Sequence, residues 1–288
     1  MEKAQSDWWD AKLQDPVGGR TGGAGCTGKT MVIDKGLGPG TFTDLISMSA
    51  PYIDIIKLGF GTAALTPYDI LQFKIEQAKM KGITITPGGT FLEIALKLGL
   101  ENEFLAQVHR LGFNGLEISD GSFPMSREKR SELIQRGVDM GLTIYTEYGK
   151  KLGGSSLEIE HFVETAVADL KVGAELVIIE GRESGSGAGV YHADGSLKKD
   201  DFMSILQTMP LPEKVMWEAP RKEQQVFLIK TLGANVHLGN IPYEDVIALE
   251  ALRRGLRADT AVLMDQISQE SSGIDAALPD PGEFGYLK

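Results

Sequence analysis

A repeat of about thirty residues is the feature of this sequence that most limits its fold. A glycine followed within a few residues by a short apolar run recurs along the chain, at Gly82, Gly112, Gly141, Gly173 and Gly233. The first intervals are 30, 29 and 32 residues, and the last, of 60, spans two units. Glycine just past a helix C-terminus takes the left-handed conformation without a Cβ penalty, so each repeat predicts a helix followed by a strand.

Short β-branched runs alternate with amphipathic stretches, which is typical of βα units and a parallel sheet. The predicted strands are Thr30–Lys35, Ile53–Leu58, Ile83–Thr86, Gly115–Ser119, Leu142–Glu147, Glu175–Glu180, Val215–Glu218 and Asn235–Leu238. Eight strands at this period predict an α/β fold of the (β/α)8 TIM-barrel class, with an open doubly wound sheet as the alternative. We assign residues 30–266 to a catalytic barrel domain, 1–29 to a flexible N-terminal extension and 267–288 to a C-terminal extension.

Composition limits the partners and the compartment. The chain carries 29 Lys and Arg against 40 Asp and Glu, a net charge of −11, which disfavours nucleic acid and anionic membranes as partners. The single cysteine, Cys26, excludes an internal disulfide framework, and no uncharged apolar run reaches the length of a membrane helix. We therefore expect a cytoplasmic protein with small-molecule partners, and the sequence leaves open whether it forms a homo-oligomer.

The segment Gly23–Thr30 matches the phosphate-loop pattern G-x-x-x-x-G-K-[ST]. That pattern binds nucleotide only when a strand enters the loop and a helix leaves it, so that backbone N–H groups converge on the phosphates. Here a glycine-rich stretch leads in, and the apolar run Met31–Ile33 leads out into a predicted strand. The order favours a flexible leader over a nucleotide site.

Three acidic residues, Glu117, Glu147 and Glu180, lie at the carboxyl ends of neighbouring predicted strands. Because side chains alternate along a strand, all three can point into the barrel, at the end where barrel enzymes carry their chemistry. Three carboxylates in one pocket repel one another unless a cation binds, and Mg²⁺ fits oxygen ligands of this kind. The alternative is that they pair with nearby Lys or Arg; the next candidate ligands are Asp34, Asp120 and Glu218.

Basic and glycine-rich positions at the same end indicate an anionic substrate. Lysines and arginines stand at or just after strand ends, and the loops Pro87–Thr90 and Gly181–Gly189 offer bare backbone N–H groups. The predicted substrate-binding residues are Lys35, Lys57, Gly88, Gly89, Arg182, Gly185, Gly187, Arg221 and Asn240. The alternatives are that the lysines are merely solvated at the surface and that the loop Gly181–Gly189 is a mobile lid.

Eight blocks in order resemble the phosphosulfolactate synthase family, which includes bacterial members and plant heat-stress-associated relatives. The blocks are Asp34–Leu37, Lys57–Thr62, Pro87–Thr90, Glu117–Ser122, Glu147–Lys151, Ile179–Gly185, Glu218–Pro220 and Leu252–Arg257. The resemblance implies a (β/α)8 lyase that adds sulfite to phosphoenolpyruvate with Mg²⁺, giving (2R)-2-phospho-3-sulfolactate, the first step of sulfonate biosynthesis towards coenzyme M in archaea. The alternative is a non-catalytic or differently specific barrel of the family with a stress-related role.

Addition to the enolpyruvate also needs a proton donor, and a lysine near other cations can have its pKa lowered enough to serve. Counting by twos from Glu147 passes Gly149 and reaches Lys151, which makes Lys151 the predicted general acid. Gly149 permits a turn that resets the alternation, so Lys150 remains the alternative.

Overall fold

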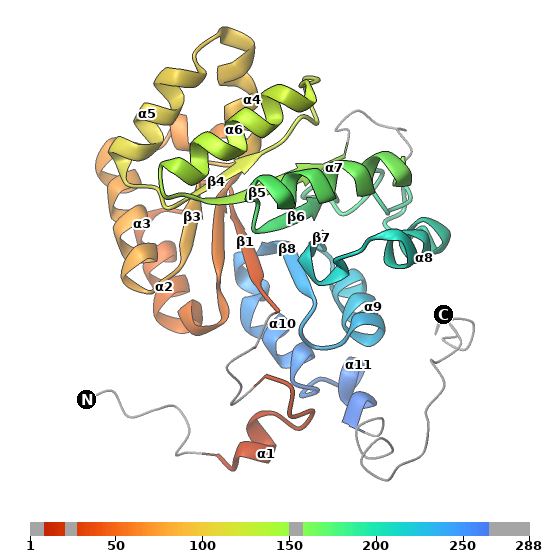
Figure 1. The fold of residues 1–288 in the computed structure, drawn as a ribbon. Helices are drawn as coiled ribbons and strands as arrows, with labels where there is room; N and C mark the ends of the chain where they lie inside the picture. Colours follow the sequence, from red (N-terminus) through yellow and green to blue (C-terminus); the bar gives the residue numbers. More distant parts are fainter. Residues whose placement is uncertain (1–8, 21–27, 150–157, 265–288) are drawn as a thin grey trace.

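Eight parallel strands surrounded by helices form the body of the protein, in a computed structural model that describes residues 9–20, 28–149 and 158–264 (Figure 1). The strands are β1 (Thr30–Asp34), β2 (Ile55–Leu58), β3 (Thr84–Thr86), β4 (Gly115–Ile118), β5 (Thr143–Tyr148), β6 (Leu176–Ile179), β7 (Val215–Glu218) and β8 (His237–Pro242). Their order in the sheet is β3-β2-β1-β8-β7-β6-β5-β4, and β3 also contacts β4, which brings the two edges together. The predicted (β/α)8 barrel is confirmed.

The helices follow the predicted repeat. They are α1 (Ala11–Gln14), α2 (Pro39–Ser49), α3 (Tyr68–Met80), α4 (Gly89–Leu98), α5 (Glu101–Leu111), α6 (Arg127–Asp139), α7 (Ile159–Val172), α8 (Lys199–Thr208), α9 (Lys222–Leu232), α10 (Val246–Arg253) and α11 (Ala258–Ala261). All five glycines of the repeat have positive φ, from 73° at Gly82 to 130° at Gly173. They end α3, α5, α6, α7 and α9, as the repeat predicts.

Strand β8 runs to Pro242, four residues beyond its predicted end at Leu238. Gly239 and Asn240, which follow the predicted end, are poor strand formers. In the structure the β1–β8 register shifts between Thr30 and Val32, and Asn240 has a φ of 53°. This irregularity lets pairing with β1 continue past the two residues.

The side chains inside the barrel establish which strand residues point inward. Met31, Ile55, Tyr145, Leu176, Ile178 and Met216 form one buried apolar cluster, separate from the larger core between strands and helices. Residues two positions further along the same strands therefore face the same interior, at its carboxyl end. On β2, β5 and β7 these residues are Lys57, Glu147 and Glu218, and Glu180 follows β6 in the same phase.

Residues from the chain start lie against the amino end of the barrel. Arg20 pairs with Glu250 at 2.9 Å and donates to Asn235 Oδ1 at 3.0 Å, while Val17 packs on the core. The described part of the N-terminal segment, residues 9–20, is thus in contact with the barrel. Within the described ranges, no helix has the length and apolar character needed to cross a membrane.

The end of the phosphate-loop pattern also lies at the amino end of the barrel. Thr30 starts β1, Lys29 forms an ion pair with Glu175, and the Lys29 N–H donates to His237 Nδ1 at 2.9 Å. A strand follows the pattern in place of the helix that phosphate binding needs, as the sequence predicts. Residues 23–27 of the pattern lie outside the described residues.

Candidate active site

A pocket of about 260 Å³ opens at the carboxyl ends of the strands. Its lining residues are Ile33, Lys57, Gly59, Phe60, Gly88, Gly89, Thr90, Glu117, Glu147, Glu180, Arg182, Glu183, Glu218 and Asn240. In barrel enzymes this end carries the active site, because every strand delivers its last residues there. The pocket is therefore the candidate active site.

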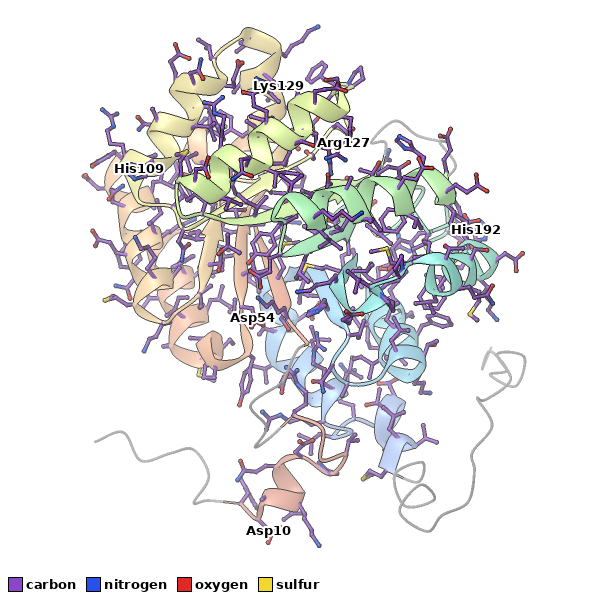
Figure 2. The ribbon with its side chains drawn as sticks, viewed as in Figure 1. Asp10, Asp54, His109, Arg127, Lys129 and His192 are labelled. Carbon is purple, nitrogen blue, oxygen red and sulfur yellow. The ribbon has the colours of Figure 1, made fainter. Side chains whose placement is uncertain are left out.

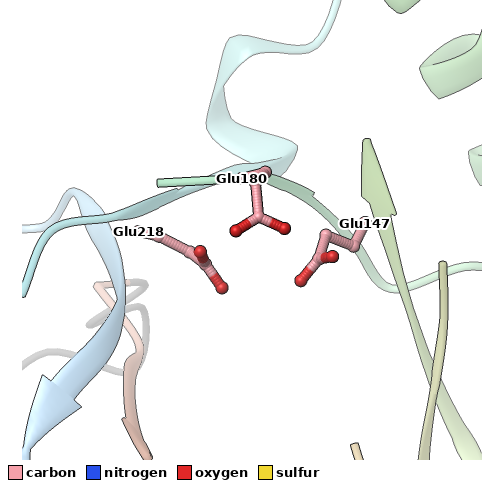
Figure 3. Close-up of side chains that lie close together, drawn as sticks. All are labelled: Glu147, Glu180 and Glu218. Carbon is pink, nitrogen blue, oxygen red and sulfur yellow. The ribbon is translucent and has the colours of Figure 1, made fainter. Parts of the chain in front are cut away.

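Three carboxylates converge in the pocket. Glu147 and Glu218 stand at the ends of β5 and β7, Glu180 follows β6, and the three are 1–4% exposed. One oxygen from each lies within 4.8 Å of the others, and Figure 3 shows the three side chains turned towards a common point. Buried carboxylates at this spacing repel one another, and oxygen donors of this kind suit a hard divalent cation.

Glu117, a member of the predicted metal-binding trio, is not part of the converging set. Its Oε1 accepts from the Gly89 N–H at 2.8 Å, and its Oε2 lies 3.3 Å from Lys57 Nζ. Glu218, a reserve candidate in the sequence, belongs to the converging set instead. It could have been ranked higher, because it follows the inward residue Met216 by two positions.

Four buried carboxylates of the pocket form an acidic cluster: Glu117, Glu147, Glu180 and Glu218. Lys57 is buried beside this cluster, with 5% of its surface exposed. Its Nζ lies 2.7 Å from Glu218, 3.3 Å from Glu117 and 3.5 Å from Glu147. Burial opposes its charge, but the three carboxylates outweigh burial and raise the pKa of Lys57 well above its usual value. The salt-bridge alternative thus holds for Glu117 and Glu147 of the predicted trio, and Lys57 also pairs with Glu218.

The acidic cluster still carries excess negative charge. Lys57 and Arg182 are the cationic side chains that line the pocket among the described residues, and the acidic ones outnumber them. Burial and the nearby Glu147 raise the pKa of Glu218, which the Lys57 ammonium partly offsets. A divalent cation bound beside Lys57 would balance the remaining charge, so the donor set fits Mg²⁺.

Unusual backbone conformations coincide with the pocket. Phe60, Arg182 and Asn240 are the non-glycine residues of positive φ in the described part of the chain, at 58°, 59° and 53°, and all three line it. Such conformations cost free energy and concentrate at functional sites. At Gly89 an added Cβ would lie 2.8 Å from Glu117 Oε1, so the N-terminus of α4 approaches the acidic cluster only with glycine.

The structure brings together many of the predicted site residues and leaves others apart. Lys57, Gly88, Gly89, Arg182 and Asn240 line the pocket with Glu117, Glu147 and Glu180. Lys35, Gly185, Gly187 and Arg221 are not among its lining residues, and Lys35 is exposed. Lys150 and Lys151 lie outside the described residues.

The reserve acids Asp34 and Asp120 serve in structural ion pairs outside the pocket. Asp34 Oδ2 lies 2.6 Å from Lys74 Nζ, and Asp120 Oδ1 lies 3.3 Å from Arg130 Nη1. Sequence reasoning included Phe60 in the Lys57–Thr62 block but did not assign it to the site. A phenylalanine between two glycines just after a predicted strand was the available signal.

A (β/α)8 barrel with a buried acidic pocket at the carboxyl ends of its strands defines a TIM-barrel enzyme. The fold is similar to that of N-acetylneuraminate lyase from Mycoplasma synoviae, with a TM-score of 0.50, 11% identity, and coverage of 92% of this chain and 94% of that one. Residues 20–259 match the sequence model described as (2R)-phospho-3-sulfolactate synthase (ComA). The chain belongs to this family, which confirms the resemblance seen in the sequence.

Relatives from two domains of life support the assignment. The chain is 43% identical over 235 residues to the phosphosulfolactate synthase of Methanocaldococcus jannaschii, covering 81% of this chain and 93% of that protein. It is 37% identical over 256 residues to the phosphosulfolactate synthase of Bacillus subtilis, covering 88% of this chain and 99% of that protein. The likeness therefore extends over the whole barrel.

Proposed function

We propose that this protein is a cytoplasmic phosphosulfolactate synthase that adds sulfite to phosphoenolpyruvate with Mg²⁺, giving (2R)-2-phospho-3-sulfolactate. Family membership gives the reaction class. The observation that carries the proposal is the convergence of Glu147, Glu180 and Glu218 beside Lys57 in the pocket. A trianionic substrate and a sulfite dianion need cationic charge in the pocket. Lys57 supplies one positive charge, and the three carboxylates can bind a cation that supplies more.

The reaction is an addition without redox change. The sulfur lone pair forms a C–S bond to the methylene carbon of the enolpyruvate, and the π electrons of the double bond move towards the neighbouring carbon and its carboxylate. A proton then attaches to that neighbouring carbon. The protein must hold the two anions together, tolerate charge on the carboxylate and supply the proton.

Glu147, Glu180 and Glu218 are the residues that we propose hold Mg²⁺. Glu218 takes the place of Glu117 in the set predicted from sequence, because oxygens of Glu147, Glu180 and Glu218 lie within 4.8 Å of one another. A bound divalent cation supplies positive charge that stabilises the negative charge building on the substrate carboxylate.

The remaining anionic groups are proposed to lie towards the loop side of the pocket. Arg182 offers a guanidinium fork that suits phosphate or sulfite, and the N-terminus of α4 at Gly88 and Gly89 adds the positive end of a helix dipole. Asn240 Oδ1 is buried without a hydrogen-bond partner in the described structure; as an acceptor it suits a cation, so only the amide N–H groups of Asn240 can donate to an anionic substrate. These residues bind and orient the substrates.

The proton donor is proposed to be Lys151, with Lys150 as the alternative. Lys57 is unsuited to the role, because its three carboxylate neighbours raise its pKa and hold its proton. The donor must therefore come from another group. The charged pocket residues also favour catalysis over a non-catalytic, stress-related role, which would not require them.

Turnover of the purified chain tests the proposal. The protein is incubated with phosphoenolpyruvate, sulfite and Mg²⁺, and products are followed by ³¹P NMR and mass spectrometry. We expect a new phosphate ester with the mass of phosphosulfolactate, which needs sulfite and disappears when EDTA is added. The proposal is contradicted if phosphoenolpyruvate stays unchanged when the folded protein is supplied with sulfite and Mg²⁺.

A further inference from the structure

The loop between β6 and α8 donates backbone hydrogen bonds to two of the pocket carboxylates. Its first N–H, from Gly181, donates to Glu218 Oε2 at 2.8 Å, and the next, from Arg182, donates to Glu180 Oε1 at 2.9 Å. Figure 2 marks the far part of this loop at His192. The direction in which Glu180 and Glu218 point therefore depends on where the loop backbone lies.

Gln224, in the first turn of α9, fixes the middle of the loop. Its side chain is 4% exposed, and its Nε2 donates to the Gly185 carbonyl at 2.8 Å and the Gly195 carbonyl at 3.1 Å. Its Oε1 accepts from the Arg221 N–H at 3.2 Å. One buried amide thus joins two separate points of the loop to the start of the helix.

Arg221 reinforces the same attachment from the solvent side. Its Nε donates to the Ser184 carbonyl and its Nη1 to the Asp194 carbonyl, each at 2.7 Å. The loop backbone lies so close that a Cβ at Gly195 would be 2.1 Å from Nη1. The arginine that the sequence assigned to substrate binding is therefore occupied in holding the loop.

We propose that Gln224, reinforced by Arg221, is a positioning residue for sulfite addition. It holds the β6–α8 loop so that the N–H groups of Gly181 and Arg182 keep Glu218 and Glu180 turned into the pocket. The inference rests on the proposed function for its effect on turnover, but its effect on the loop is independent of the reaction. Losing the Gln224 side chain should disturb the loop more than losing the Arg221 side chain, because buried hydrogen bonds are costlier to lose than exposed ones.

The test replaces Gln224 with Glu, which keeps the size but removes both N–H donors. Asn114→Asp is the matched control at the opposite end of the barrel, where the amide donates to the Ile83 carbonyl at 3.2 Å and accepts from the Ile85 N–H at 2.7 Å. Hydrogen exchange over residues 181–195 is measured in metal-free, substrate-free protein. Steady-state kinetics with phosphoenolpyruvate, sulfite and Mg²⁺ follow on the same preparations.

We expect Gln224→Glu to speed exchange at Gly181 and Arg182 roughly tenfold to a hundredfold, the effect of one or two buried hydrogen bonds. The ratio kcat/KM should fall by a similar factor, while Asn114→Asp leaves both unchanged. Arg221→Met removes exposed contacts only and should shift both readouts in the same direction by a smaller factor. It also serves as the test variant if Gln224→Glu does not fold.

Two results overturn the inference. Unchanged exchange at Gly181 and Arg182 would show that the helix does not hold the loop, and faster exchange with unchanged kcat/KM would show that the attachment has no catalytic role. Failure of the proposed function appears separately, as a wild-type protein that forms no phosphosulfolactate. In that case the exchange measurement alone decides whether Gln224 holds the loop.

Discussion

Replacing Lys57 with Met should destabilise the metal-free protein strongly. Lys57 is buried and its Nζ lies within 3.5 Å of Glu117, Glu147 and Glu218. Methionine keeps the length of the side chain and removes only the charge. The three carboxylates then remain buried without their ammonium.

The magnitude follows from the contacts that survive. Removing one partner of a buried ion pair costs about 3–5 kcal/mol. Glu117 keeps the Gly89 N–H and Glu218 keeps the Gly181 N–H, so the cost should stay within that range although three carboxylates are affected. For a domain of this size, the loss corresponds to a fall in Tm of roughly 10 °C.

The pH dependence of the stability of Lys57→Met provides an independent test of the same reasoning. Without the ammonium, the folded-state pKa of the cluster carboxylates rises, so the folded variant binds protons more readily than the unfolded chain. The stability of Lys57→Met should therefore recover as the pH falls from about 8 to 5.5, relative to wild type. In the wild type, the contribution of Lys57 to stability stays constant over this pH range, because the raised pKa of Lys57 lies far above the range.

Urea unfolding in EDTA at several pH values measures both effects, with Lys35→Met as the control. Lys35 is exposed, and its substitution should change the free energy of unfolding by no more than about 0.5 kcal/mol. A loss below about 1 kcal/mol for Lys57→Met, with no recovery at lower pH, would refute the electrostatic account of the cluster.

Four further predictions follow from the site and the barrel. Replacing any one of the three converging carboxylates with Gln should weaken Mn²⁺ binding at least about tenfold in calorimetry, more than Glu117→Gln does; equal effects would contradict the proposed ligand set. Lys151→Ala should lower kcat at least about a hundredfold and Lys150→Ala should mainly raise KM; the opposite ranking moves the acid to Lys150. Burial lowers the pKa of His237 to about 4, so folding should lose about 3 kcal/mol as the pH falls from 6.5 to 4 in urea titrations, and His237→Gln should flatten that dependence. Lys29→Ala should leave ATP titrations flat, as in wild type, because Lys29 pairs with Glu175; saturable binding lost in the variant would restore the nucleotide-loop reading.

Local sequence signals were sufficient for the barrel and for much of the pocket. The helix-ending glycines set the repeat, and strand alternation placed Glu147 and Glu180 inward, where the structure has them. The same alternation applied to Glu218, which shows that the sequence contained this ligand candidate although it was ranked second.

Contacts between distant parts of the chain were beyond such reasoning. Nothing local in the sequence shows that Gln224 binds carbonyls of the β6–α8 loop, or that Arg20 meets Glu250 across 230 residues. Gly185 and Gly187 were predicted to bind anions through bare N–H groups; in the structure these N–H groups donate to the Arg182 carbonyl at 3.3 Å and the His192 carbonyl at 2.9 Å, partners that the local sequence does not show. Side-chain-to-backbone pairing of this kind depends on the tertiary fold.

The position of a bound ion tests the central claim most directly. Crystals of the protein with Mn²⁺ and phosphoenolpyruvate, measured at the manganese absorption edge, give an anomalous peak for the ion. We predict one strong peak among Glu147, Glu180 and Glu218, with phosphoenolpyruvate beside it in the pocket. A peak at another place, or phosphoenolpyruvate bound away from these carboxylates, would contradict the account.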